Sequence, residues 1–587
     1  MVMVPVIRTS TGACCLVSLI AVSLVIACGD GGGPSVPQDL PPDLSLSGDS
    51  VATAGSPYVL RYRATDDSGL RFIVIDWDEG GARDTIITSN ARSAEGTRSH
   101  VYTDAATRRI GGEVSDNAGQ SAADTLPVRI RSDADSGKVA LTLDASTTFQ
   151  TMDGWGMSLP APVSMVFGVN PLASFPFQTG EDDPLYRLLF DEQAGLGLNL
   201  ITLYQWWDFD GSWSGAVRPT YEETNDDDDP NHINWAGFEL SSRWPNFGVA
   251  RRAQQLGARL KLTVGGVPGW MATSDEAVNP AMGDEFAEYL SAFILFARDS
   301  LGLDIAYLSI MNEPNNKGRL SATAHATLLN RVAAMLDGKG LSTKLVAPEA
   351  VSINGAVAYT QRFLGDATTL ARLGAISTHP YGGDTPENWS SLFTLADGAG
   401  LGVWQTEFST APSGTGGTSY TIEDALRLAQ DIRRHLVQGN VSAWFNFLGV
   451  GCDCGTDGGA GGALIVFRPS GGSSFEYLLP PRYYAFGQFS RYVRPGARRI
   501  GVTPDEEAVQ PVAFRTTSGN IVLILINPRS EGAEVSVAGW GGASEVSVTR
   551  TSATEQGADL GSFAVEGGSV MLSVPPKSVT TVIGNNL

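Results

Sequence analysis

Positive charge is scarce in this 587-residue chain. Lysine and arginine together number 40 against 63 aspartates and glutamates, which gives a formal net charge of −23 at pH 7. A surface of this sign repels nucleic-acid phosphates and anionic lipid headgroups, so we expect no nucleic-acid partner. The most acidic run, NDDDDP at 225–230, favours a solvated loop over a calcium site.

Cysteine and histidine are equally rare, with five residues of each. We expect Cys14 and Cys15 to be removed with an N-terminal segment, which leaves Cys28, Cys452 and Cys454. Three cysteines make no disulfide framework, and the spacing in CDC is shorter than the two-residue spacing usual for zinc ligands. The sequence therefore predicts no metal site and no cofactor.

The apolar run near the N-terminus is short. LVSLIAVSLVIA, from Leu16 to Ala27, is too short to span a bilayer but suits the hydrophobic part of a signal peptide. It leads into VIAC, which resembles a bacterial lipobox whose cysteine, here Cys28, is lipidated after cleavage. We predict a signal peptide over 1–27, a flexible tether over 28–38 and a lipoprotein held at the cell envelope; plain secretion and a buried helix are the alternatives.

Short segments of alternating apolar and polar residues fill 39–132. They include YVLRYRAT, RFIVIDWD and RRIGGEVSD, and turn sequences such as DDSG and DNAG separate them. This pattern predicts a small β-sandwich. The pieces IDWDEGG, SHVYTD and VSDNAGQ resemble a polycystic-kidney-disease-type or related immunoglobulin-like domain, which we interpret as a spacer, with glycan binding as the alternative.

From Leu141 onward, strand-like runs alternate with amphipathic helical ones. Helical stretches such as EFAEYLSAFILFARDSLG have apolar residues at three-and-four spacing and a glycine near the end. Eight strands alternating with helices predict a closed (β/α)8 TIM barrel over 139–481, whose first strand is shared with a side domain. Short strands return afterwards and predict a C-terminal β-sandwich over 482–587. The eight strand-like runs are FQTMDGWGMS, LNLITLYQ, ARLKLTVGG, LDIAYLSIMNE, KLVAPE, LGAISTHPY, LGVWQTE and VSAWFNFLG.

Polar residues end four of the predicted barrel strands. Their spacing, 36 residues from Glu313 to Glu349, 30 to His379 and 28 to Glu407, is close to the length of a βα unit, about 31 residues. Because barrel enzymes place their chemistry at the C-terminal ends of the strands, we expect these side chains to meet at the barrel mouth. In SIMNEPNN, we expect Pro314 to hold Glu313 in an extended conformation.

Glu313 and Glu407 end the fourth and seventh predicted strands. Two carboxyl groups across a barrel mouth suit glycoside hydrolysis, because one can protonate the departing oxygen while the other attacks the anomeric carbon. Repulsion between nearby carboxylates separates their pKa values, so a shared proton can reside on the acid.

Seven motifs between residue 139 and the C-terminus resemble glycoside hydrolase family 30, whose members are retaining barrel enzymes with a side β-sandwich. This resemblance implies that Glu313 is the acid/base and Glu407 the nucleophile. It also implies that Asn312 binds near the sugar 2-hydroxyl, that Tyr381 hydrogen-bonds Glu407, and that Trp444 is a platform under the sugar. The motifs are FQTMDGWGMS, LFDEQAGLGLNL, SIMNEPNN, LVAPE, ISTHPYG, VWQTEFS and RYYAFGQFSRYVRPGARRIGV.

Further sugar contacts are expected from Trp155, Trp206 and Trp207, because aromatic faces with polar rims suit pyranose rings. Core packing is the alternative for these tryptophans. His379 is predicted to contact substrate, and a purely structural role at the mouth is the alternative. A structural role at the mouth is also considered for Glu349.

The chain departs from the family at two positions. Thr202 stands in strand 2 where an arginine is frequent, and Gly265 follows strand 3 where a tryptophan is frequent. The loop NFLGVGCDCGTDGGAGGALIVF contains no lysine or arginine before Arg468, which disfavours an acidic substituent on the substrate. We therefore predict a retaining hydrolase of a neutral β-linked poly- or oligosaccharide, with β-1,6-galactan or β-glucan favoured. The alternatives are a xylan-active hydrolase of the same family and a non-catalytic surface glycan-binding protein.

Overall fold

The computed structural model describes ten stretches of the chain: 39–131, 138–159, 184–205, 221–240, 247–273, 277–409, 420–453, 462–471, 474–504 and 508–585. The chain divides into two compact units, Met1–Asp133 and Ala134–Leu587. The predicted signal peptide, Cys28 and the tether lie outside the described residues. Within the described part of the chain, no helix combines the length and the apolar character needed to cross a membrane.

The first unit is a β-sandwich, as predicted. One sheet has the order β1-β3-β6 and the other β2-β8-β7-β4-β5. In β3 every second side chain is buried, and these residues meet Ile73, Ile75 and Trp77 in one core. The immunoglobulin-like resemblance of this unit stays a prediction. Its strands are β1 Asp43–Ser47, β2 Val51–Thr53, β3 Pro57–Thr65, β4 Leu70–Asp76, β5 Arg83–Ile87, β6 Ser93–Val101, β7 Ala106–Asp116 and β8 Ser121–Arg131.

The second unit contains the predicted barrel. Its eight parallel strands follow one another around a closed barrel, and β10 pairs with β17 to complete it. All eight sequence runs supply one strand each. The strands are β10 Gly154–Leu159, β11 Leu200–Gln205, β12 Arg259–Val264, β13 Ile305–Ser309, β14 Lys344–Ala350, β15 Leu373–Thr378, β16 Gly402–Phe408 and β17 Val441–Asn446.

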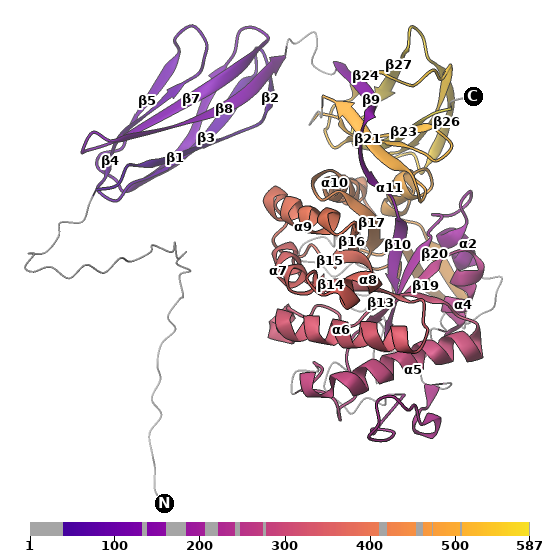
Figure 1. Ribbon diagram of the computed structural model, residues 1–587. Coiled ribbons are helices and arrows are strands. Elements are labelled where there is room, and N and C mark those ends of the chain that lie inside the picture. Colours follow the sequence, from indigo (N-terminus) through magenta and orange to yellow (C-terminus); the bar gives the residue numbers. More distant parts are fainter. Residues whose placement is uncertain are drawn as a thin grey trace, which may run out of the picture. The chain divides into compact units, whose positions relative to one another are not determined.

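Helices surround this barrel on its outer face (Figure 1). The amphipathic stretches form them as expected: α10 buries Leu428, Ile432 and Leu436 on one side, and α5 ends at Gly302, whose φ of 65° suits glycine. The helices are α2 Pro184–Phe190, α4 Phe247–Gln255, α5 Gly283–Leu301, α6 Ala322–Gly338, α7 Ile353–Phe363, α8 Ala367–Arg372, α9 Pro386–Gly398 and α10 Ile422–Gln438, with single 3₁₀ turns η4 Trp235–Gly237, η5 Pro280–Met282 and η6 Asn316–Gly318.

A second β-sandwich follows the barrel, as predicted. Its nine strands form one ladder, β26-β25-β28-β23-β22-β21-β9-β24-β27, which folds over a common core that includes Leu523, Val535 and Val548. The strands are β9 Lys138–Thr151, β21 Arg498–Thr503, β22 Gln510–Arg515, β23 Ile521–Asn527, β24 Ala533–Ala538, β25 Glu545–Thr551, β26 Ala558–Ala564, β27 Ser569–Val574 and β28 Ser578–Gly584.

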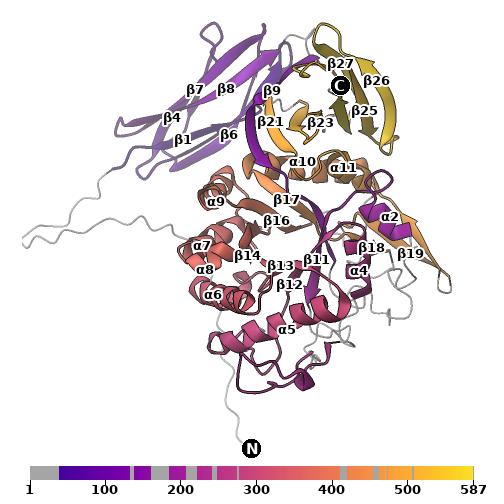
Figure 2. The same ribbon diagram turned by 45° about the vertical axis from the view of Figure 1, so that its right-hand side comes forward.

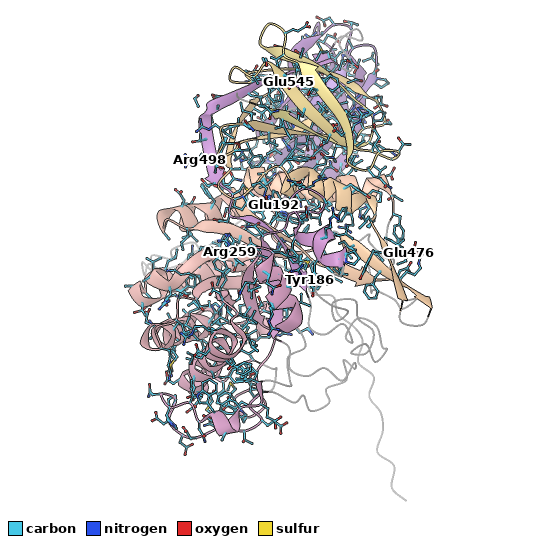
Figure 3. The ribbon with its side chains drawn as sticks, turned by 90° about the vertical axis from the view of Figure 1, so that its right-hand side faces the viewer. Tyr186, Glu192, Arg259, Glu476, Arg498 and Glu545 are labelled. Atoms are coloured by element: carbon cyan, nitrogen blue, oxygen red, sulfur yellow. The ribbon has the colours of Figure 1, made fainter. Side chains whose placement is uncertain are left out.

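Two connections join this sandwich to the barrel. Strand β9 belongs to the sandwich sheet and leads directly into β10 of the barrel (Figure 2). Helix α11, Pro481–Ser490, leads back from the barrel into β21, after a small sheet of β18 Val450–Cys452, β19 Ile465–Gly471 and β20 Ser474–Leu478. Glu192, labelled in Figure 3, pairs at 2.7 Å with Arg494, which follows α11. The sandwich is therefore tied to the barrel at the start and at the end of the barrel sequence.

Candidate active site

Glu313 lies four residues after β13, at the C-terminal mouth of the barrel. The Asn312 N–H donates to the carbonyl of Val264 at 2.7 Å, and the Glu313 N–H donates to the carbonyl of Glu349 at 3.0 Å. Glu313 has a φ of 49°, so the expectation of an extended backbone before Pro314 is wrong. A positive φ is costly for a residue with a side chain, and the two backbone hydrogen bonds to neighbouring strand ends hold Glu313 in it.

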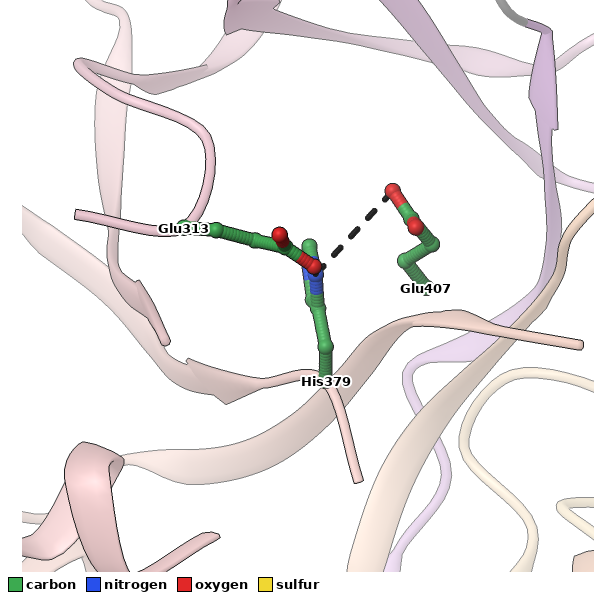
Figure 4. A group of neighbouring side chains, drawn as sticks. All are labelled: Glu313, His379 and Glu407. Carbon is green, nitrogen blue, oxygen red and sulfur yellow. Dashed lines mark hydrogen bonds and ion pairs between the residues drawn. The ribbon is translucent and has the colours of Figure 1, made fainter. Parts of the chain in front are cut away.

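Glu407 lies near the end of β16, and its carboxyl group faces that of Glu313 (Figure 4). One carboxylate oxygen of each lies within 4.8 Å of the other. Glu313 is 9% exposed and Glu407 8%, so both groups are largely withdrawn from water. The fold thus brings together the two carboxylates that the sequence singled out, although they are 94 residues apart.

Two tyrosine hydroxyls donate to Glu407. The Tyr381 hydroxyl reaches Oε1 at 3.2 Å, the contact that the resemblance implies, and the Tyr204 hydroxyl donates to Oε2. Tyr204 is fully buried in β11, whereas Tyr381 is 42% exposed at the mouth. Burial raises the pKa of both phenols well above the ordinary value, and the charge of Glu407 raises it further. Both tyrosines therefore stay protonated as donors to this carboxylate.

His379 lies between the glutamates rather than at the surface. Its side chain is fully buried, Nδ1 is 3.1 Å from Glu313 Oε1 and 4.0 Å from Glu407 Oε2, and Nε2 is 3.5 Å from Glu349 Oε2. Burial opposes its charge, but Glu407, Glu313 and Glu349 together raise its pKa to about 10. The prediction that His379 contacts substrate is corrected. Its ring is fully buried and interacts with the carboxylates of Glu313 and Glu407 instead.

Glu349 forms a second, deeper ionic contact. Its Oε2 is 2.9 Å from Lys261 Nζ and its Oε1 accepts from the Thr406 hydroxyl at 2.6 Å. Burial opposes ionisation of Glu349, but the charges of Lys261 and His379 hold its pKa well below the ordinary value. Glu349 also has a positive φ, 60°. The mouth is thus supported from below by a buried ion pair.

The pKa directions of the two central carboxyls differ. Burial opposes ionisation of Glu313, but the hydrogen bond and charge of His379 lower its pKa below the ordinary value. Burial raises the pKa of Glu407, against the lowering effect of His379 and Tyr204. In the free protein the electrostatics therefore favour ionisation of Glu313 more than that of Glu407.

Asn312 is the remaining polar group expected at the mouth. It is 8% exposed, and within the described residues its Oδ1 has no hydrogen-bond partner. A buried amide oxygen without a partner is costly, so this atom is available to a ligand donor. Gly265, which follows β12 directly, is the next residue after Val264, to whose carbonyl Asn312 is bound.

The structure corrects two of the tryptophan predictions. Trp155 and Trp444 are both fully buried. The Trp155 indole donates to the carbonyl of Val493 at 2.6 Å and that of Trp444 to His435 Nδ1 at 3.1 Å, and both rings pack on Phe486 of α11. Alternate residues of a barrel strand point outward, and these two face the helix layer. Trp206 and Trp207 lie outside the described residues.

The sequence reasoning missed Tyr204 and Lys261. Tyr204 lies near the end of the run NLITLYQ. A polar residue at the end of an apolar run is the signal that singled out the two glutamates. Lys261 is a charged residue inside the strand RLKLTV, flanked by the buried Leu260 and Leu262. A lysine in such a strand requires a buried anionic partner, and this signal pointed to a carboxylate inside the barrel.

Glu313, His379 and Glu407 each offer a donor atom within 4.8 Å of the others, a set that could hold a metal ion. A histidine ligates a metal through an unprotonated nitrogen. The raised pKa of His379 keeps both nitrogens protonated at neutral pH, because three glutamates surround the ring. The arrangement thus favours proton handling by a carboxylate pair over metal binding.

Comparison with known proteins relates parts of the chain to glycoside hydrolases. Residues 496–582 match the Glycosyl hydrolase family 30 beta sandwich domain, and residues 221–452 match Glycosyl hydrolase family 59. A glucuronoxylanase, XynC, of Bacillus subtilis (strain 168) is 26% identical over 302 residues, which cover 51% of this chain and 66% of the relative. An endo-beta-1,6-galactanase of Hypocrea rufa is 22% identical over 451 residues, 71% of this chain and 85% of the relative.

A solved structure shows the same fold. The catalytic domain of GH30 xylanase C from Talaromyces cellulolyticus superposes with a TM-score of 0.58 at 22% identity, covering 76% of this chain and all of that one. The barrel and side sandwich are shared, as the motifs predict. Together with the match of residues 496–582, the relatives confirm the resemblance of this chain to glycoside hydrolase family 30.

Proposed function

We propose that this protein is a retaining β-glycoside hydrolase with Glu313 as acid/base and Glu407 as nucleophile. The observation that carries the proposal is the approach of their carboxylate oxygens to within 4.8 Å. Retaining enzymes hold their two carboxyl groups about 5 to 5.5 Å apart, whereas inverting enzymes need about 6.5 to 9.5 Å to admit a water. The approach of the nearest oxygens supports the retaining route, and the distance between the two carboxyl carbons is the quantity that tests it.

In the first step the Glu407 carboxylate attacks the anomeric carbon while Glu313 transfers its proton to the departing glycosidic oxygen. This forms a glycosyl ester on Glu407 and releases the aglycone as an alcohol. In the second step Glu313, now ionised, takes a proton from water, whose oxygen displaces Glu407. The Tyr204 and Tyr381 hydroxyls donate to the two oxygens of Glu407 and so hold the attacking carboxylate in place.

These roles require a proton on Glu313, whose pKa is lowered in the free protein by His379. A sugar bound at the mouth removes water from Glu313, and desolvation raises the pKa of a carboxyl group. His379 Nδ1, 3.1 Å from Glu313 Oε1, is placed to supply the proton directly. The two tyrosine donors favour the ionised form of Glu407 as the nucleophile, and the order of the two roles is the one that the resemblance to family 30 implies.

Activated and unactivated substrates test the roles. Glu407→Ala should abolish turnover of both, because no covalent intermediate can form. Glu313→Ala should spare part of the activity on aryl glycosides whose leaving group needs no protonation, and azide should restore turnover as a β-glycosyl azide. Equal loss on both substrate types in both variants would contradict the assignment, and unchanged glycan binding without turnover in the parent protein would favour a non-catalytic glycan-binding role.

For the substrate we propose a neutral β-linked glycan, with β-1,6-galactan or β-glucan ahead of xylan. The loop after β17 has no lysine or arginine before Arg468, and Arg468 itself pairs with Asp453 at 2.6 Å. A uronic-acid substituent would meet a strongly anionic protein with this cation already engaged. Gly265 in place of a bulky side chain leaves room for a hydroxymethyl group. The long match to an endo-beta-1,6-galactanase supports this choice, and that to a glucuronoxylanase supports the alternative.

Initial rates on β-1,6-galactan, β-glucan and glucuronoxylan would separate these substrates. We expect the highest rate on one of the two neutral glycans. A preference for glucuronoxylan that disappears when its uronic acids are reduced would overturn the charge argument.

We also propose that the chain is exported and anchored through a lipidated Cys28. VIAC at the end of the apolar run supports this. Cys28→Ala should move the protein from the membrane fraction to the soluble fraction, and an unchanged distribution would contradict the anchor.

A further inference from the structure

Three aspartates meet at one end of the N-terminal β-sandwich. Asp39 precedes β1, Asp66 begins the turn between β3 and β4, and Asp116 ends β7. One carboxylate oxygen of each lies within 4.8 Å of one oxygen of each of the others. Two of them belong to DDSG and DNAG, which the sequence analysis treated only as turns.

Each carboxylate has one oxygen that accepts a hydrogen bond, from its own turn in Asp66 and Asp116 and from Gln120 in Asp39. Asp66 Oδ2 accepts from the Ser68 N–H at 2.9 Å, Asp116 Oδ1 from the Gln120 N–H at 2.7 Å, and Asp39 Oδ2 from the Gln120 side-chain amide at 3.0 Å. These bonds fix the direction in which the second oxygen of each aspartate points.

The second oxygens have no partner. Asp39 Oδ1, Asp66 Oδ1 and Asp116 Oδ2 are buried atoms without a hydrogen bond in the described structure. Asp116 is fully buried as a residue, so water cannot satisfy its free oxygen from outside. A buried carboxylate oxygen with nothing to bind costs free energy, and such an atom requires an explanation.

Nothing in the described part of the chain neutralises this group. No lysine or arginine there forms an ion pair with Asp39, Asp66 or Asp116. Three negative charges this close repel one another, and burial weakens the screening by solvent. A bound cation would remove the repulsion and fill the empty coordination of all three oxygens at once.

We propose that Asp39, Asp66 and Asp116 bind a calcium ion. Carboxylate oxygens are the ligands of hard cations, and the group contains no histidine or cysteine that would favour zinc. The three ligands come from separate segments, which suits the variable geometry and number of ligands of calcium better than the strict octahedron of magnesium. The ion ties the chain at Asp39 to the β3–β4 and β7–β8 turns and so fixes the entry into this sandwich.

Hydrogen exchange of the full chain, first stripped with a chelator, tests the site. Millimolar CaCl2 should slow amide exchange several-fold in peptides that cover 39–47, 66–70 and 116–121. Because exchange is read peptide by peptide, calcium bound at the acidic run 225–230 would not be mistaken for this site. Equal protection by MgCl2 at the same concentration would overturn the choice of calcium.

Three variants complete the test. Asp66→Asn and Asp39→Asn should abolish the calcium-dependent protection. Because Asp39 precedes the first strand, the sandwich can fold without this carboxylate. Asp43→Asn, which removes an exposed carboxylate of the same unit, should keep the protection. Protection that persists in both site variants, or no protection in the parent protein, would refute the proposal. The result does not depend on the proposed hydrolase activity.

Discussion

Lys261 Nζ lies 2.9 Å from Glu349 Oε2, and both side chains are buried, at 0% and 1% exposure. The pair joins β12 to β14 inside the barrel, directly below the carboxylates of the mouth. Glu349 in turn lies 3.5 Å from His379 Nε2. The ionisation of the carboxylates at the mouth is thus coupled, through His379, to a charge pair that solvent does not reach.

Removing one partner of this pair should destabilise the fold strongly. Lys261→Met leaves Glu349 buried and less compensated, and we expect a loss of about 3 to 5 kcal/mol in the free energy of unfolding. Lys261→Met combined with Glu349→Leu should lose clearly less than the two single losses added together. Urea unfolding followed by tryptophan fluorescence measures both.

A surface pair provides the control for that experiment. Arg331 pairs with Asp284 where the side chains are 34% and 61% exposed, so Arg331→Met should cost less than about 1 kcal/mol. If the double variant lost the full sum of the single losses, Lys261 and Glu349 would not be coupled.

The hydroxyl of Tyr204 should matter for turnover rather than for substrate binding. Tyr204→Phe removes a donor to the carboxylate of Glu407, and a hydrogen bond to a charged group contributes about 1.5 to 3 kcal/mol. We expect kcat to fall about 10- to 100-fold with little change in KM. Tyr221→Phe, whose hydroxyl donates to the carbonyl of Tyr289 instead, should keep normal kcat. A kcat for Tyr204→Phe equal to that of this control would show that the contact does not serve the reaction.

His379 should set the acid limb of the pH–rate profile. Its positive charge lowers the pKa of Glu313 and opposes the rise in the pKa of Glu407. His379→Gln removes this charge, so both carboxyl pKa values should rise and the acid limb of kcat/KM should move to higher pH. An acid limb that stays in place would mean that the histidine is neutral in the working enzyme.

The same histidine predicts a loss of stability at alkaline pH. The pKa of His379 is raised from 6.5 to about 10, so the folded protein keeps a proton that the unfolded chain releases. This contribution is complete below pH 6.5 and is lost as the pH rises through about 10. The parent protein should therefore lose stability between these values, and His379→Gln should lose less over the same range, as urea midpoints across the series would show.

Deleting the N-terminal sandwich should leave the chemistry intact. The described residues of the candidate site all belong to the second unit, Ala134–Leu587. Removal of 39–132 should therefore leave kcat/KM on small soluble glycosides unchanged. A truncated protein that shows the normal circular dichroism of the barrel but no activity would mean that this sandwich shapes the active site.

The sequence by itself determined the architecture and the central pair. Eight apolar runs at regular spacing predicted the barrel because parallel strands buried on both faces must be apolar throughout. Glu313 and Glu407 stood out because each interrupts such a run at its end, and barrel geometry brings strand ends together at the mouth. These features are local or periodic, and local patterns can be recognised along the chain.

The tertiary structure alone decided the surroundings of that pair. Trp155 and Trp444 lie one residue from inward-facing positions, and the register of β10 with β17 turns both toward the helices. The positive φ of Glu313 results from hydrogen bonds to distant strand ends, which overrode the local preference before Pro314. Likewise, His379 and Lys261 acquire their roles from partners 28 to 88 residues away. Burial and charge at such positions depend on long-range contacts, which the order of residues along the chain does not display.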